Sequence, residues 1–294
     1  MKPAEFDYVR PQTVSEALGL LAENPDAKVL AGGQSLLTLM NLRLARPAML
    51  IDIGALDELR RIFDDTDDLV LGSLITHRTV ETDPLIGARA PLLADAARHI
   101  GHIGIRNRGT IGGSVAHADP AAEMPLATLV LDATFHIESA TTGRREVSAE
   151  DMFVSFYTNA LEQHELLTWI SIPNARPDQG WGFVEYAHQH GDYGMAGAGC
   201  ALTLSADGRV AALRAGVLAA ADRPLLFVGD EAVGSVPSAT LWAELARDWA
   251  ARTEPAADDA DYARRLCASA LREAMATAHR RLVDQAQEDH RDVS

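Results

Sequence analysis

Residues 105–125 read IRNRGTIGGSVAHADPAAEMP, and an earlier segment, residues 31–40, reads AGGQSLLTLM. Each segment holds a Gly-Gly pair with a serine one or two residues later. Such a pair lets the backbone adopt positive φ and lets amide N–H groups approach an anion without an intervening Cβ. Two converging turns of this kind would hold a pyrophosphate with little help from Lys or Arg. For either turn alone, backbone geometry is the better explanation, whereas two turns with matching hydroxyls favour a bound ligand.

Outward from the first pair, the pattern predicts a small unit of helices and strands. Thr13-Val14-Ser15-Glu16 is a capping box that opens a helix ending near Asn24-Pro25. A strand over 28–31, a helix over 36–44 and a strand over 49–53 follow. The first Gly-Gly pair therefore precedes a helix N-terminus, where the helix dipole favours an anion.

Around the second pair, the pattern is harder to assign to regular elements. Residues 101–114 contain five glycines interleaved with Ile, Arg and Asn, which predicts a loop holding a specific backbone path. Strands are predicted over 69–75 and 134–139, and helices over 91–100 and 120–131.

The segment 174–180 (NARPDQG) is the strongest domain boundary in the chain. Beyond it, strands are predicted over 181–187, 198–205 and 209–218, with Ala206-Asp207-Gly208 as a hairpin turn. Two alanine-rich helices, about 238–251 and 259–283, complete a three-strand antiparallel sheet with helices against one face. We expect domains at 1–176 (lobes about 1–57 and 58–176) and 177–285, then a frayed tail over 286–294.

Composition excludes several classes of function. The chain has 294 residues, 47% of them hydrophobic, which is enough to build cores and argues against disorder. Its formal charge of −16 argues against nucleic acid and anionic membranes as partners. No apolar run approaches the roughly 18 residues of a spanning helix, and residues 1–5 do not begin a signal peptide. We expect a cytoplasmic protein with no membrane insertion.

Cysteine and histidine usage predicts no metal site and no catalytic side chain. Cys200 and Cys267 have small or apolar neighbours and are expected to be buried reduced thiols. Iron–sulfur clusters typically need four thiolates, so any cluster must sit on another chain. With no third ligand in view, His188 and His190 are expected to be exposed rather than a metal pair. His99 and His102 receive the same interpretation.

The familiar motifs of nucleotide and hydrolytic sites are missing. The sequence has no GxGxxG after a strand, no GxxxxGK[ST], no GxSxG, no HExxH and no CxxC. Arg106 and Arg108 would contact phosphate or pair with the abundant carboxylates, and the acidic composition favours the carboxylates.

Residues 31–40, Arg46-Pro47, residues 50–53 (LIDI) and residues 105–125 together resemble the FAD-binding medium subunit of the molybdenum hydroxylases. The segment EYAHQHGDYGMAGAG (185–199) extends the resemblance toward the C-terminus. It implies an α+β fold: a two-lobed FAD-binding domain of the vanillyl-alcohol-oxidase (PCMH) type, then a small C-terminal α+β domain. Relatives carry basic residues near 186–190, where this chain reads YAHQH. This departure weakens the transfer of a basic flavin contact.

The resemblance also implies which residues bind FAD. Residues 29–36 and 110–114 would surround the pyrophosphate, and Glu123 would accept from ribose hydroxyls. Ile100 and Leu167 would line the adenine or flavin, and Tyr193 would lie beside the isoalloxazine or be a core aromatic. Asp119 would bind the cofactor or cap the following helix. The full set is Val29, Leu30, Ala31, Gly32, Gly33, Gln34, Ser35, Leu36, Ile100, Thr110, Ile111, Gly112, Gly113, Ser114, Asp119, Glu123, Leu167 and Tyr193.

The function implied is an electron-transfer subunit whose FAD takes electrons from [2Fe–2S] clusters and passes them to an external acceptor. A large partner would carry the molybdopterin cofactor and a small partner two [2Fe–2S] clusters, in a dimer of heterotrimers. The local likeness favours an N-heteroaromatic substrate, with carbon monoxide or a purine as alternatives. Two further readings are a self-sufficient flavin oxidoreductase and an assembly subunit whose glycine turns are structural. Flavin absorbance of the purified chain separates the last from the others.

Overall fold

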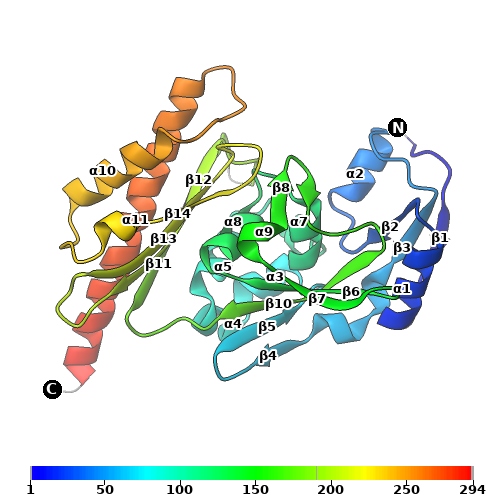
Figure 1. Ribbon diagram of the computed structural model, residues 1–294, viewed down its shortest axis with the longest axis horizontal. Coiled ribbons are helices and arrows are strands. Elements are labelled where there is room, and N and C mark those ends of the chain that lie inside the picture. Colours follow the sequence, from blue (N-terminus) through cyan, green and yellow to red (C-terminus); the bar gives the residue numbers. More distant parts are fainter. Residues whose placement is uncertain (1, 190, 293–294) are drawn as a thin grey trace.

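The described residues, 2–189 and 191–292 of a computed structural model, form three main sheets that follow one another along the long axis in Figure 1. The N-terminal sheet lies at one end of the molecule and the C-terminal helices at the other. The fold is therefore three α+β units in a row, and segments of different units contact each other where neighbouring units meet.

The N-terminal unit is a parallel sheet of order β1-β3-β2. Its elements are β1 (Asp7–Val9), α1 (Val14–Glu23), β2 (Ala27–Leu30), α2 (Leu36–Asn41) and β3 (Met49–Asp52), followed by short 3-10 turns at Ile53–Ala55 and Asp57–Arg60. The Thr13 hydroxyl accepts from the amide of Glu16, which is the predicted cap. The Glu16 carboxylate accepts from the amide of Gln12, one residue before the capping residue. Leu18, Leu21 and Ile51 form part of the core under this sheet.

The central unit is a five-stranded antiparallel sheet with helices on one face (Figure 1). Its strands, in spatial order, are β4 (Ile62–Asp64), β5 (Asp68–Gly72), β10 (Glu165–Pro173), β6 (Thr134–Ser139) and β7 (Gly143–Ser148). Its helices are α3 (His77–Thr82), α4 (Pro84–Arg89), α5 (Pro91–Ala97), α6 (Ile103–Arg106), α7 (Ile111–His117), α8 (Glu123–Val130) and α9 (Ala149–Met152). A small hairpin, β8 (Phe153–Ser155) and β9 (Thr158–Asn159), adjoins α7.

The glycine-rich segment 101–114 is not a continuous loop, which corrects the prediction. It contains α6 and the start of α7, each with a side-chain cap. The Nδ1 atom of His102 accepts from the amide of Gly104, and the Thr110 hydroxyl accepts from the amide of Gly113. These caps offset the low helix propensity of glycine in two very short helices.

The C-terminal sheet has four antiparallel strands, where the sequence predicted three. They are β11 (Gln179–Tyr186), β12 (Ala196–Leu204), β13 (Val210–Leu218) and β14 (Leu225–Val228), followed by a 3-10 turn at Asp230–Ala232. The additional strand, β14, is only four residues long and does not alternate polar with apolar residues. Its pairing with β13 therefore comes from tertiary contact.

Helices cover both faces of this C-terminal sheet, which corrects the expectation of one covered face. Helices α10 (Ala239–Ala250) and α11 (Ala260–Asp292) pack on one face, and α5 and α8 of the central unit pack on the other. Small residues permit this approach, since a Cβ on Gly216 would lie 2.8 Å from Leu126 Cδ1. Strand β12 is consequently buried along almost its whole length.

Helix α11 continues to Asp292, so residues 286–292 of the expected frayed tail are helical. The segment is rich in Gln, Glu, Asp and Arg, most of which form helices readily. Among the described residues, none of the helices is both long enough and apolar enough to cross a membrane.

Candidate functional site

Two glycine-bearing segments, 31–36 and 108–113, lie directly against each other. A Cβ on Gly113 would lie 3.7 Å from the Cβ of Ala31, and one on Gly32 would lie 2.2 Å from the carbonyl oxygen of Arg108. The structure therefore brings together the two segments that the pyrophosphate hypothesis required to converge.

Within each pair, the first glycine is required for backbone packing. Gly32 packs on Arg108, and a Cβ on Gly112 would lie 2.6 Å from the carbonyl oxygen of Ser73. No real Cβ tolerates either distance, so close packing alone explains why these two positions are glycine. Of the four glycines, only Gly33 has a positive φ, at 73°.

The first turn, at residues 33–35, has the backbone features of an anion-binding nest. Gly33 provides the left-handed residue, and the backbone amides of Gly33, Gln34 and Ser35 donate to no protein acceptor among the described residues. Ser35 also makes no capping bond with its side chain. Successive amides that converge without a protein partner bind anions such as phosphate. Residues 29–36 are all half-buried, so a ligand here would be partly shielded from water.

The second pair is not a nest, which corrects the expectation of two matching turns. The amides of residues 111–114 all donate within the protein, to the carbonyl oxygens of Ile75, Ser73 and Thr110 and to the Thr110 hydroxyl. Both glycines lie in the first turn of α7. This segment therefore shapes one wall of the site, and Ser114 in it is a half-buried polar side chain.

Beyond the C-terminal end of α7 lie two of the predicted acidic residues. Asp119 accepts from the amide of Ala121 at 2.9 Å and caps the turn at Pro120, whereas the N-cap of α8 is Ala122. Glu123 is the first residue of α8. Burial, followed by the charge of the neighbouring Asp119, raises the pKa of Glu123 to about 7.

A third carboxyl, Glu185, lies near Glu123, and Asp119, Glu123 and Glu185 together form an acidic cluster. Glu185 was missed by the sequence analysis. It lies on β11, where burial, followed by the charge of Glu123, raises its pKa to about 8. Its Oε2 atom is buried and has no hydrogen-bond partner among the described residues. The alternation of residues along the predicted strand could have revealed that Glu185 faces inward, because Glu185 shares a strand face with the buried Phe183.

Two exposed tyrosines border the same cluster. Tyr193 is 75% exposed, so it is not a core aromatic, and Tyr157 is 59% exposed. Burial of the hydroxyl and the charge of Asp119 raise the pKa of both phenols. The Tyr157 ring lies 5.1 Å from the ring of His117, the last residue of α7. Tyr157 was not predicted, since it lies in a turn whose position is set by tertiary contact.

The two predicted apolar contacts, Ile100 and Leu167, both belong to the main hydrophobic core. Ile100 is 9% exposed and Leu167 is 3% exposed. Ile100 ends the α5 region and precedes Gly101, whose backbone lies against Gly191 of the Tyr193 loop. Ile100 therefore borders the site, whereas Leu167 lies deeper, in strand β10.

The arginines differ from each other in their surroundings. Arg106 is buried and forms an ion pair with Glu81 at 3.0 Å, which is the carboxylate pairing that the sequence analysis favoured. Arg108 is exposed and forms no ion pair among the described residues, contrary to expectation. Its backbone contact with Gly32 places it at the border of the nest, which makes it a candidate phosphate contact.

The histidines do not form a metal site within residues 2–189 and 191–292. His102 caps α6, and the ring of His99 packs on Phe183. His188 is exposed and lies beyond the end of β11, while His190 lies outside the described residues. Cys200 and Cys267 are buried free thiols, as predicted.

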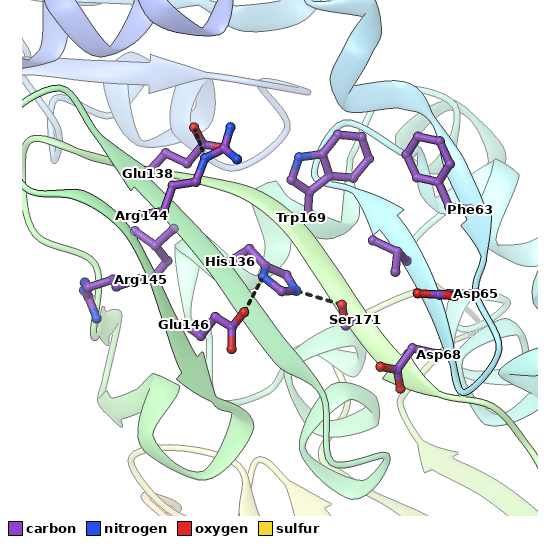
Figure 2. Close-up of a pocket in the computed structure, with 12 residues that line it drawn as sticks. Phe63, Asp65, Asp68, His136, Glu138, Arg144, Arg145, Glu146, Trp169 and Ser171 are labelled. Atoms are coloured by element: carbon purple, nitrogen blue, oxygen red, sulfur yellow. Dashed lines mark hydrogen bonds and ion pairs between the residues drawn. The ribbon is translucent and has the colours of Figure 1, made fainter.

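A cavity of about 790 Å³ lies elsewhere, on the sheet face opposite the helices (Figure 2). In it, His136 Nε2 lies 2.7 Å from the Ser171 hydroxyl, and His136 Nδ1 lies 3.3 Å from a Glu146 carboxylate oxygen. This row of Ser171, His136 and Glu146 resembles the nucleophile, base and acid of a catalytic triad. However, His136 is the register partner of Glu146 on β7 and lies on the strand next to Ser171 of β10, so strand pairing alone accounts for these contacts. The row is a cross-strand polar contact.

Comparison with known proteins identifies the family. Residues 4–175 match the family described as the FAD binding domain in molybdopterin dehydrogenase. The chain belongs to the FAD-binding medium subunits of the molybdenum hydroxylases. This FAD subunit is part of a molybdenum-dependent oxidoreductase, so the resemblance inferred from the two glycine segments is confirmed.

Relatives and solved structures extend the match over nearly the whole chain. The nicotine 6-hydroxylase medium subunit of Paenarthrobacter nicotinovorans is 41% identical over 217 residues, covering 74% of this chain and 75% of that protein. A chain of quinoline 2-oxidoreductase from Pseudomonas putida 86 superposes with a TM-score of 0.91 at 35% identity, covering 96% and 99%. A chain of carbon monoxide dehydrogenase from Hydrogenophaga pseudoflava gives 0.90 at 34%, covering 95% and 98%.

The residues present fit FAD. The nest at residues 33–35 suits a pyrophosphate, and the buried oxygen of Glu185, which has no polar partner among the described residues, suits a polar group of a ligand. Helix α7 runs from the nest to the acidic cluster, and its seven residues span about 10 Å. That length suits the distance between the pyrophosphate and the flavin ring of one extended FAD molecule.

Proposed function

We propose that this medium subunit binds FAD with its pyrophosphate in the nest at residues 33–35 and its flavin end beside the acidic cluster at the far end of α7. Three consecutive backbone amides that have no acceptor within the described part of the chain carry this proposal. The segments 29–36 and 110–114 would enclose the pyrophosphate, and Glu123 would accept hydrogen bonds from hydroxyls of the sugar or ribityl chain. Tyr193 and Ile100 would border the flavin end.

Bound FAD supplies the redox chemistry, and the protein holds it and shields it. In this proposal the subunit takes electrons from [2Fe–2S] clusters of a small partner chain and passes them to an external acceptor. A large partner carries the molybdopterin cofactor and hydroxylates the substrate. Both thiols of this chain are buried singly, which supports placing the clusters elsewhere and suits a cytoplasmic location.

The substrate of the whole enzyme is proposed to be an N-heteroaromatic compound. Support comes from the names of similar proteins, since one relative is a nicotine hydroxylase subunit and one solved structure is a quinoline oxidoreductase. We further propose a dimer of heterotrimers as the working assembly.

The test is to purify the chain alone and together with candidate large molybdopterin-binding and small [2Fe–2S] partner chains. The lone chain is expected to show flavin absorbance bands at one FAD per chain and no turnover of small organic substrates. The co-expressed complex is expected to reduce its flavin when an N-heteroaromatic substrate is added, at a mass of two heterotrimers. Comparable turnover by the lone chain would instead establish a self-sufficient flavoenzyme.

A further inference from the structure

Glu185 is a buried acid with an unmet hydrogen-bonding need. It lies in β11 opposite Gly197 of β12, and its Oε2 atom is buried without a partner among the described residues. A Cβ on Gly194 would lie 3.1 Å from Glu185 Cγ and 3.2 Å from its Cδ. The side chain is therefore covered by the loop that also carries Tyr193.

Among residues 2–189 and 191–292, none of the Lys or Arg side chains forms an ion pair with Glu185. Glu123 on α8 is the charged group that acts on it directly. Asp119 and Tyr193 lie next to Glu123, and His99 packs on Phe183, on the same face of β11 as Glu185. Across the strand, Tyr186 faces the opposite way and donates to Glu273 of α11.

We propose, building on the FAD site described above, that Glu185 is a flavin-binding acid that remains protonated and donates its hydrogen bond to an acceptor atom of the flavin ring. Two carboxylates close together in a poorly solvated site cannot both ionise without a large cost. A proton on Glu185 removes that repulsion and turns the side chain into a donor.

The donor role explains why the buried Oε2 has no protein partner. A buried polar atom that lacks a partner costs stability unless a ligand satisfies it. The N1 atom and the carbonyl oxygens of the flavin ring are acceptors, and they gain electron density on reduction. A protonated Glu185 would therefore bind reduced flavin more strongly than oxidised flavin and raise the midpoint potential.

The experiment compares Glu185→Gln and Glu185→Leu in the full chain, titrated with FAD between pH 6.5 and 9.5. Glutamine keeps a neutral donor of the same shape, and leucine removes it. Wild-type affinity is expected to fall about tenfold across this range, because a tenfold change matches one hydrogen bond. Glu185→Gln is expected to stay flat with pH, and Glu185→Leu to bind about tenfold more weakly at pH 6.5.

Flavin midpoint potentials of the same proteins give a readout that a structural role would not move. Glu185→Leu is expected to lower the potential, while Glu185→Gln at pH 6.5 keeps it near the wild-type value. Glu273→Gln is the matched control, because it alters a carboxyl next to β11 on the opposite face. It is expected to leave both affinity and potential unchanged.

Two outcomes would overturn this inference alone: wild-type affinity and potential in Glu185→Leu, or a wild-type pH dependence in Glu185→Gln. A wild-type chain that binds no FAD at any pH would overturn the proposed function, and this inference with it. Thermal unfolding of each apo variant separates lost binding from lost folding.

Discussion

The backbone amide of Tyr157 donates a hydrogen bond to the carbonyl oxygen of Ala118 at 3.1 Å, and both residues have a φ of 51°. Left-handed backbone at a non-glycine residue costs about 1–2 kcal/mol. Two such residues bonded to each other fix the end of α7 against the β8–β9 hairpin. This contact holds Tyr157 at the border of the acidic cluster.

Replacing Ala118 with Gly is expected to stabilise the apo chain by about 0.5–1 kcal/mol. Glycine avoids the steric cost that alanine has at this positive φ, and this gain exceeds the additional conformational entropy that glycine loses on folding. Ala116→Gly, two residues earlier within α7, is the matched control and is expected to destabilise by about 1 kcal/mol. Urea unfolding measures both. Equal destabilisation by the two variants would contradict the strain assigned to Ala118.

Gly32→Ala is expected to destabilise the chain by about 3 kcal/mol, at the upper end of overpacking effects. The new Cβ would meet the Arg108 carbonyl oxygen, which belongs to rigid backbone. Gly19→Ala, in the open middle of α1, is the control and is expected to stabilise by about 0.5–1 kcal/mol. Thermal unfolding of apo proteins decides, and a wild-type midpoint for Gly32→Ala would refute the packing role.

Gly33→Ala is expected to reduce FAD affinity at least tenfold in a protein that still folds. A side chain at a φ of 73° is strained, and relief of that strain rotates the amides of the nest out of line. Gly143→Ala, at a φ of 79° in the β6–β7 turn, carries a similar strain far from the nest. Calorimetric titration should show weakened binding only for Gly33→Ala. Equal FAD affinities for the two variants would count against the nest.

Glu123→Ala is expected to weaken FAD binding by about 1.5–3 kcal/mol, the range for a hydrogen bond to a charged group. Glu150→Ala, on the exposed first turn of α9, serves as the control and should bind normally. Equilibrium dialysis with apo protein measures the affinities. If Glu123→Ala released flavin only on global unfolding, a packing role would replace the binding role.

Apo stability is expected to fall as pH rises from 6.5 to 8.5. Burial raises the pKa of Glu123 to about 7 and that of Glu185 to about 8, from an ordinary value of 4.5, so the folded chain holds more protons than the unfolded chain. Below pH 6.5, His77 opposes this trend, because burial lowers its pKa to about 4. Urea titrations should show a shallower fall for Glu185→Gln. An unchanged slope would contradict burial of a protonated Glu185.

Much of the local structure followed from sequence because it depends on residues close together in the chain. The Thr13 cap, the strand–turn–helix around Gly33 and the hairpin at residues 206–208 are all set by neighbouring side chains and turn chemistry. The two glycine segments, together with Arg46-Pro47, residues 50–53 and residues 185–199, also carried the resemblance to the family, which the match over residues 4–175 confirms.

The tertiary structure alone decided what each of those glycines does. Gly32 and Gly112 are required by Arg108 and Ser73, which lie far away in sequence, and no local pattern encodes such contacts. For the same reason β14 and the second covered face of the C-terminal sheet were not predicted.

The acidic cluster shows the same division between sequence and structure. Glu123 could be named from its motif, whereas Glu185 acquires its raised pKa only when folding buries it near Glu123. Desolvation and like-charge repulsion depend on distance in space, so a sequence can supply the carboxyl but only the folded chain determines its protonation.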